Sequence, residues 1–193
     1  MKLLILDRDG TINSDSDDFV KTPEEWLPLP GALEAIARLN HAGWHVVVAS
    51  NQSGLGRGLF DVASLNAMHA KMYKLLAAQG GRIDAVFYCP HTADEDCHCR
   101  KPRPGLFEQI GSRFGVQLSG VPAVGDSLRD VLAGVAAGCE PHLVLTGKSA
   151  IYRAGGRPEG LPPGTLVHAD LSAFADFILE RSARSERTAP AAE

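Results

Sequence analysis

The sequence lacks a long apolar run at its start. The first apolar run, Leu3–Leu6, follows Met1-Lys2 and ends at Asp7. Four residues are far fewer than the about 20 that a membrane-spanning helix needs, and also fewer than the apolar segment of a secretory signal peptide. We therefore expect no signal peptide, no membrane contact and a cytoplasmic location.

An excess of positive charge is also missing. The chain has 19 Lys and Arg against 23 Asp and Glu, which gives a formal net charge of −4 at pH 7. General nucleic-acid binders usually present a basic face, so we expect no nucleic-acid partner. A small anionic substrate stays compatible with this charge, because a pocket can be locally basic on an acidic protein. Nothing in the sequence points to an obligatory protein partner.

Cysteine is scarce, and it is unevenly placed. Three of the four cysteines, Cys89, Cys97 and Cys99, lie within a few residues of one another, whereas Cys139 stands alone. In a reducing compartment such a cluster indicates a metal site and not disulfides. An isolated cysteine that follows a helix is typical of a buried, inert thiol.

What is present is an alternation of short apolar runs with longer amphipathic segments. Strands are expected at residues 3–6, 46–49, 85–88, 121–124, 142–145 and 166–167, and helices at residues 32–40, 61–79, 105–114, 128–137 and 171–184. Apolar strands that are separated by helices predict a parallel sheet covered on both faces. The expected fold is therefore a three-layer, Rossmann-like α/β domain over residues 1–181, followed by a flexible tail at 182–193. The stretch between Asp9 and Ser50 is too short for a separate cap domain, so the site should be open.

Charged and hydroxyl side chains follow the expected strands. They are Asp7 and Asp9 after the first strand, Ser50 and Asn51 after the second, Lys101 before a later helix, and Asp126 and Asp130 after the fourth strand. In parallel sheets the site lies beyond the carboxyl ends of the strands. A carboxylate can attack phosphorus, a second one can transfer protons, and a lysine with a divalent ion can offset phosphoryl charge. This set therefore predicts phosphoryl transfer.

The motifs Asp7-x-Asp9-Gly10-Thr11, Ser50-Asn51, Lys101 and Gly125-Asp126-x-x-x-Asp130 resemble, in the same order, those of the haloacid dehalogenase-like phosphatases. The resemblance covers residues 3 to about 145. It implies that Asp7 is the nucleophile, Asp9 the general acid/base, and Lys101 a stabiliser of the phosphate that Ser50 and Asn51 bind. It also implies that Asp7, Asp9 (through its backbone carbonyl) and Asp126 hold catalytic Mg²⁺, with Asp130 supporting them. The alternative of another class is a non-catalytic phosphate-binding zinc scaffold, whose mark would be a missing catalytic carboxylate.

The cysteine cluster can supply a closed tetrahedral zinc site. Cys89, His91, Cys97 and Cys99 are the best four ligands, and His98 is the spare. Because adjacent side chains reach one ion together with difficulty, Cys97 and His98 are not expected to share it. Four protein ligands leave no position for water, so the zinc should be structural.

This loop, just before Arg100-Lys101-Pro102, resembles two bacterial branches of the family. One is the heptose bisphosphate phosphatases of lipopolysaccharide precursor synthesis, and the other is the histidinol-phosphate phosphatases. Ser53 and Arg57 resemble the first branch, whereas Ser127 departs from those of its members that carry lysine there. A sugar bisphosphate needs basic groups for its second phosphate, and Arg57 and Arg100 are the candidates. Histidinol phosphate would call for acidic groups instead.

Overall fold

The computed structural model describes residues 1–188. Within this range, six strands, six α-helices and two short 3₁₀-helices follow one another along the chain. Their bounds are β1 Lys2–Leu6, α1 Ala32–His41, β2 Trp44–Asn51, α2 Ser53–Gly56, α3 Val62–Ala78, β3 Ala85–Cys89, η1 Ala93–Glu95, α4 Gly105–Phe114, β4 Pro122–Gly125, α5 Leu128–Ala136, β5 Glu140–Val144, η2 Gly147–Tyr152, β6 Leu166–His168 and α6 Leu171–Thr188.

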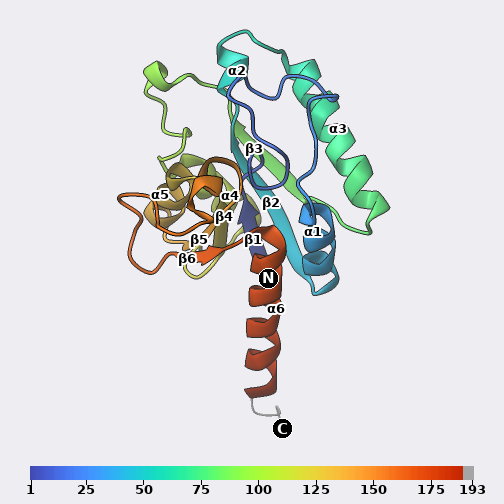
Figure 1. Cartoon of the computed structure of the whole chain (residues 1–193), viewed down its shortest axis with the longest axis vertical. Helices are drawn as coiled ribbons and strands as arrows, with labels where there is room; N and C mark the ends of the chain where they lie inside the picture. Colours follow the sequence, from blue (N-terminus) through green and yellow to red (C-terminus); the bar gives the residue numbers. More distant parts are fainter. Residues whose placement is uncertain (189–193) are drawn as a thin grey trace.

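The strands form one parallel sheet in the order β3-β2-β1-β4-β5-β6 (Figure 1). This is the doubly wound order, in which the chain first moves to one side of β1 and then returns to the other side. The order switches between β1 and β4, where Leu6 is level with Val124. Ligands of such sheets bind beyond the strand ends at this switch, so the topology places the site after β1 and β4.

Alternate residues of the central strands face opposite layers. Leu4 and Leu6 of β1 pack in one apolar cluster with α1, α3 and α6. Leu3 and Ile5 pack in a second cluster with α4 and with Ala133 of α5. The period of two along a strand produces this division, and the apolar area that both faces remove from water stabilises the three layers. The expected three-layer parallel α/β fold is confirmed.

Several element ends differ from the expected ones. Strand β2 continues to Asn51, because Ser50 and Asn51 pair with Tyr88 and Cys89 of β3. Helix α3 begins after Asp61, whose side chain accepts a hydrogen bond from the backbone N–H of Ser64 and caps the helix. The short helix α2, within the glycine-rich stretch after β2, was not expected.

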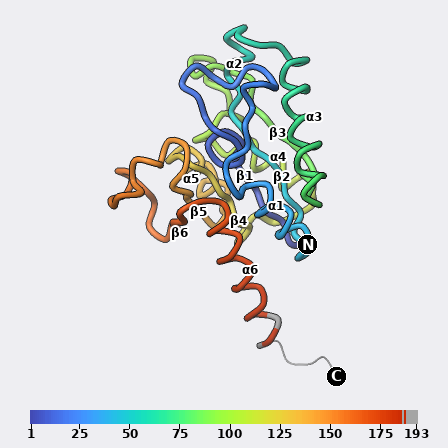
Figure 2. Tube along the Cα trace, turned by 45° about the vertical axis from the view of Figure 1, so that its right-hand side comes forward, coloured from blue at the N-terminus to red at the C-terminus, as the bar shows by residue number. Residues whose placement is uncertain are grey.

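Helix α6 extends beyond the sheet on the side opposite α2 (Figures 1 and 2). It continues to Thr188, so residues 182–188 of the expected tail are helical. Residues 189–193 lie outside the described part of the chain, and the domain boundary at residue 181 stays a prediction. Among residues 1–188, no helix combines the length and the apolar character that a membrane span requires.

Candidate active site

The carboxyl ends of β1, β2 and β4 surround a cavity of about 260 Å³. Eight of the residues singled out in the sequence line it together with Asp130: Asp7, Asp9, Ser50, Asn51, Arg57, Arg100, Lys101 and Asp126. Parallel strands end at the same edge of the sheet, which is why segments so distant in sequence meet here. The structure therefore brings together all the residues that the sequence proposed for the phosphate site.

Lys101 lines this cavity, and only 2% of its surface is exposed. Its Nζ is 2.7 Å from Asp7 Oδ1 and 2.6 Å from Asp130 Oδ1, and it donates to the carbonyl of Ala49 at 2.8 Å. Burial on its own would lower the pKa of Lys101, but the charges of Asp130 and Asp7 outweigh it and raise that pKa. The amine is therefore a fixed positive charge beside Asp7.

Asp7, Asp126 and Asp130 place carboxylate oxygens within 4.8 Å of one another. Burial and the charge of Asp130 raise the pKa of Asp7 to about 7, although Lys101 acts in the opposite direction. Burial, followed by the charges of Asp130 and Asp7, also raises the pKa of Asp126 well above its usual value. One amine cannot offset three closely spaced carboxylates, so the site has an excess of negative charge that a hard divalent cation with oxygen ligands would relieve. The donor set thus fits Mg²⁺.

Asp130 is held by contacts of both its carboxylate oxygens with the protein. Its Oδ2 accepts hydrogen bonds from the backbone N–H and the hydroxyl of Ser127, at 3.0 and 2.6 Å, in a capping box at the start of α5. Its Oδ1 is the partner of Lys101. Both oxygens are therefore engaged by the protein, which agrees with the expected supporting role.

Asn51 contacts the backbone of Lys101 with both ends of its amide. Its Nδ2 donates to the Lys101 carbonyl at 3.1 Å, and its Oδ1 accepts from the Lys101 N–H at 3.0 Å. This pair ties the end of β2 to the segment before α4. Asn51 thus holds Lys101 in place, a contact that the sequence did not indicate.

Two glycines allow the chain to approach Asp126 closely. A Cβ at Gly10, where φ is +85°, would lie 2.3 Å from Asp126 Oδ2, and one at Gly147 would lie 2.1 Å from the same oxygen. The backbone N–H of Lys148, next to Gly147, donates to that oxygen at 2.6 Å. Any side chain at these two positions would therefore displace a predicted metal ligand.

The four predicted zinc ligands lie around one point. Sulfur separations among Cys89, Cys97 and Cys99 are 3.2–3.6 Å, and His91 Nδ1 is 3.5 Å from Cys89 Sγ and 3.2 Å from Cys99 Sγ. Tetrahedral zinc with ~2.3 Å bonds to sulfur would place neighbouring sulfurs about 3.8 Å apart, close to these values. The ligand set is therefore compatible with zinc.

The remaining members of this loop and the isolated cysteine lie where they were expected. His98 points away from the cluster, with its Nε2 2.7 Å from Glu108 Oε2, so it is the spare. All four cysteines are free, and burial raises the pKa of Cys139 to about 12, which keeps it a protonated thiol.

Two predicted arginines line the cavity wall, one on each of two loops. Arg57 follows α2, and its guanidinium lies over the ring of Phe19 at 5.9 Å from the ring centroid. Arg100 donates from Nη1 to the carbonyl of His91 at 3.2 Å, which connects it to the cysteine loop. The wall is therefore basic at these points, as a second anionic group would require.

Sequence reasoning missed three polar residues at this edge. Lys148 comes after β5 and forms ion pairs with Asp15 and Asp17, which also line the cavity, at 3.1 and 2.6 Å. Lys148 follows a strand, as most of the other site residues do, so its position in the sequence was a usable signal. Arg8 and Gln52 both donate hydrogen bonds to Asp9, but they stand beside the recognised motifs and carry no separate signal.

Comparisons with known proteins agree with this geometry. A model of the HAD-hydrolase-like family matches residues 98–173. The D-glycero-beta-D-manno-heptose-1,7-bisphosphate 7-phosphatase of Bordetella bronchiseptica is 58% identical, over 94% of this chain and all of the relative. The Pseudomonas aeruginosa protein of the same name is 54% identical, over 92% of this chain and 98% of the relative.

Solved structures of such enzymes also match. The B. bronchiseptica D,D-heptose 1,7-bisphosphate phosphatase, complexed with magnesium and phosphate, has a TM-score of 0.89 at 58% identity, covering 94% of this chain and 99% of the other. The Burkholderia thailandensis D,D-heptose 1,7-bisphosphate phosphatase has a TM-score of 0.72 at 53% identity, with 93% and 99% covered. With these identities over nearly the full length, the chain belongs to the heptose-1,7-bisphosphate 7-phosphatase family of HAD-like hydrolases.

Proposed function

We propose that this chain removes the phosphate at carbon 7 of D-glycero-β-D-manno-heptose 1,7-bisphosphate, a step in the supply of ADP-heptose for the lipopolysaccharide core. The observation that carries the proposal is a single cavity lined both by Asp7 and Lys101 and by Arg57 and Arg100. The relatives at 54–58% identity are named for this reaction and this anomer. The reduced cysteine cluster favours a cytoplasmic location.

Asp7 is the nucleophile of the proposed reaction. A carboxylate oxygen of Asp7 forms a bond to phosphorus while the bond from phosphorus to the carbon-7 oxygen breaks. Asp9 gives its proton to that oxygen, and it later takes a proton from the water that hydrolyses the aspartyl phosphate. Lys101, 2.7 Å from Asp7, offsets the charge on the phosphoryl oxygens. Ser50 and Asn51 contribute to the phosphate site at the end of β2.

Asp7 and Asp126, with the backbone carbonyl of Asp9, would hold Mg²⁺, and Asp130 would support them. The ion, when bound, supplies Lewis-acid stabilisation of the phosphoryl charge. The raised pKa values of Asp7 and Asp126 reflect how strongly their charges need such an offset.

Cys89, His91, Cys97 and Cys99 would hold a structural zinc ion, because a closed set of four ligands leaves no position for a reacting water. This loop carries Arg100 and leads directly into Lys101. Zinc, when bound, would therefore order the segment that supplies the positively charged side chains of Arg100 and Lys101.

The arginines select a bisphosphate. Two phosphates cannot both occupy the site at Asp7, so the carbon-1 phosphate must bind elsewhere, and Arg57 and Arg100 are placed to accept it. Histidinol phosphate would need acidic groups for its amine and imidazole. The acidic groups on the wall, Asp15 and Asp17, are already paired with Lys148, which argues against that substrate.

Substitution of the arginines tests this assignment. Arg57→Ala or Arg100→Ala should raise KM for the 1,7-bisphosphate about tenfold or more, since a charged hydrogen bond contributes about 1.5–3 kcal/mol. The KM for the 7-monophosphate should change little, because it lacks the second phosphate. Arg113→Ala, on an exposed position of α4, is the matched control and should leave both constants unchanged. Equal losses on both substrates would contradict the assigned role.

A further inference from the structure

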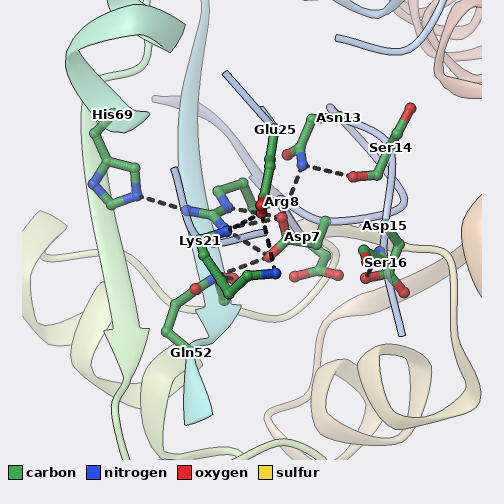
Figure 3. Close-up of polar contacts among 12 residues, drawn as sticks. Asp7, Arg8, Asn13, Ser14, Asp15, Ser16, Lys21, Glu25, Gln52 and His69 are labelled. Atoms are coloured by element: carbon green, nitrogen blue, oxygen red, sulfur yellow. Dashed lines mark hydrogen bonds and ion pairs between the residues drawn. The ribbon is translucent and has the colours of Figure 1, made fainter. Parts of the chain in front are cut away.

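Arg8, between the two motif aspartates, is a buried cation that the proposed mechanism leaves without a role. Its exposed fraction is 0%, whereas arginine is rarely buried unless it is paired. Its guanidinium lies between Asp9 and His69 of helix α3. Figure 3 shows the contact between Arg8 and His69. The ion pair joins Arg8 Nη2 to Asp9 Oδ2 at 2.9 Å. A buried charge in contact with the general acid/base is well placed to act on the reaction.

His69 holds the other side of this guanidinium. Its Nε2 is 3.3 Å from Arg8 Nη1. Burial, followed by the charge of Arg8, lowers the pKa of His69 to about 4, so the ring is neutral near pH 7 and Nε2 accepts the hydrogen bond. The other buried residues of α3 are Leu65, Met68, Met72 and Leu76. His69 is thus one polar side chain on an otherwise apolar buried face, and its acceptor atom is used by Arg8.

The hydrogen bonds to Asp9 distinguish its two oxygens. Oδ1 accepts from Arg8 Nε at 3.1 Å, Arg8 Nη2 at 2.9 Å and Asn13 Nδ2 at 2.8 Å. Oδ2 accepts from Arg8 Nη2 at 2.9 Å and from Gln52 Nε2 at 2.8 Å. The same Gln52 nitrogen donates to Ser50 Oγ at 2.8 Å. Oδ2 is therefore the oxygen on the side of the phosphate-binding residue, whereas Oδ1 is occupied by three donors.

We propose that Arg8, fixed by His69, is a positioning residue that holds Asp9 with Oδ2 directed to the reacting phosphate. The proposal rests on the phosphatase function proposed above. When the bond between phosphorus and the sugar oxygen breaks, the proton on Asp9 Oδ2 passes to that oxygen. When water attacks the aspartyl phosphate, its proton returns to Oδ2, and Asp7 leaves as a carboxylate. In both steps the fork of Arg8 prevents the carboxyl group from rotating away.

Loss of this positioning should reduce kcat and leave KM nearly unchanged. The side chain of Asp9 acts only while bonds to phosphorus form and break, so its orientation affects the transition state more than substrate binding. General acid/base catalysis contributes typically 10²–10⁴-fold. A variant in which Asp9 keeps its carboxyl group but is no longer held in one orientation should lose part of this rate enhancement. We expect its kcat to fall about 10- to 100-fold.

The test compares two substitutions of His69 with a control on the same helix. His69→Leu removes the acceptor and should lower kcat about 10- to 100-fold. His69→Gln keeps an acceptor oxygen and should restore most of the rate. Leu65→Ala, on the same buried face of α3, removes apolar packing but no hydrogen-bonding group, so it should lower stability and leave kcat near the wild-type value.

The decisive experiment introduces His69→Leu into a variant that lacks the general acid/base Asp9. If His69 acts through Asp9, His69→Leu should have almost no further effect on kcat in the Asp9→Asn background. Should His69→Leu fail to fold, Arg8→Lys replaces it, because lysine keeps the charge but not the two-point contact. Equal losses with and without Asp9, a slow His69→Gln, or the same loss in Leu65→Ala would overturn the proposal.

The two proposals fail in different ways. The assays measure phosphate release from heptose 1,7-bisphosphate with Mg²⁺. If the wild type does not cleave this substrate, a panel of sugar phosphates and histidinol phosphate is tested, and the ester that the wild type cleaves fastest is used. An inactive wild type on the bisphosphate contradicts the proposed substrate, whereas the comparison of variants on the accepted ester still decides the role of Arg8 and His69.

Discussion

Asp7→Asn should abolish turnover and, at the same time, stabilise the metal-free protein. An amide cannot replace the attacking carboxylate, so activity should fall by several orders of magnitude. The effect on stability comes from the crowding of carboxylates. Burial and Asp130 raise the pKa of Asp7 from 3.8 to about 7, which means that ionised Asp7 is disfavoured in the folded protein. Asparagine removes that charge, and its side-chain oxygen can still accept from Lys101.

The size of the stabilisation follows from this pKa shift. The folded protein binds a proton on Asp7 more tightly than the unfolded chain does, so the contribution of Asp7 to the stability of the metal-free wild type falls as pH rises from about 4 to about 7. At 1.36 kcal/mol per pKa unit, the loss approaches about 4 kcal/mol above pH 7. The attraction from Lys101 is already part of the shift. We therefore expect Asp7→Asn to unfold with a free energy about 2–4 kcal/mol higher at pH 8, and with no difference near pH 4.

Urea unfolding of both proteins, with EDTA and with Mg²⁺, measures this difference. In EDTA at pH 8 the variant should have the higher midpoint. Saturating Mg²⁺ should stabilise the wild type by mass action but not the variant, which lacks a metal ligand, so the gap should close or reverse. A variant less stable than the wild type in EDTA at pH 8 would refute the reasoning from carboxylate repulsion.

Three further predictions concern the metals. Gly10→Ala should weaken Mg²⁺-dependent activity at least tenfold, an order-of-magnitude loss, because its Cβ would displace Asp126; Gly43→Ala, which has φ +84° but no atom within 4 Å, is the control and should keep that activity. Cys97→Ser should lower both stability and the zinc content, which metal analysis of the wild type should give as about one ion per chain, whereas Cys139→Ser should keep the zinc. The apparent Kd for Mg²⁺, measured by calorimetric titration, should rise about tenfold per pH unit below pH 7, because a proton on the nucleophile competes with the ion.

The fold, and the convergence of the candidate site residues at one edge of the sheet, were largely predictable from the sequence. Strands that are apolar throughout indicate a parallel sheet, and the ends of such strands meet at one edge. These two rules, together with the order of the motifs, predict that Asp7, Ser50 and Asp126 meet in one site. The convergence of the four predicted zinc ligands was equally predictable, since their short spacing in the sequence limits how far the side chains can lie from one another.

The contacts around Asp9 were not predictable in the same way. An arginine within a motif of charged residues is usually solvated, and nothing in the sequence indicates that Arg8 is fully buried. Its contact with His69 spans 61 positions and depends on how α3 packs on the sheet. The amide of Asn51 likewise binds the Lys101 backbone only because β2 runs on through polar residues. Tertiary packing decides these contacts, and the local pattern does not.

Product analysis of the wild-type enzyme tests the central claim most directly. With Mg²⁺ and heptose 1,7-bisphosphate, phosphate release followed by ³¹P NMR should show loss of the carbon-7 phosphate and retention of the phosphate at carbon 1. Under the same conditions, the 7-monophosphate and histidinol phosphate should react much more slowly. Release of the carbon-1 phosphate, or a preference for histidinol phosphate, would contradict the account.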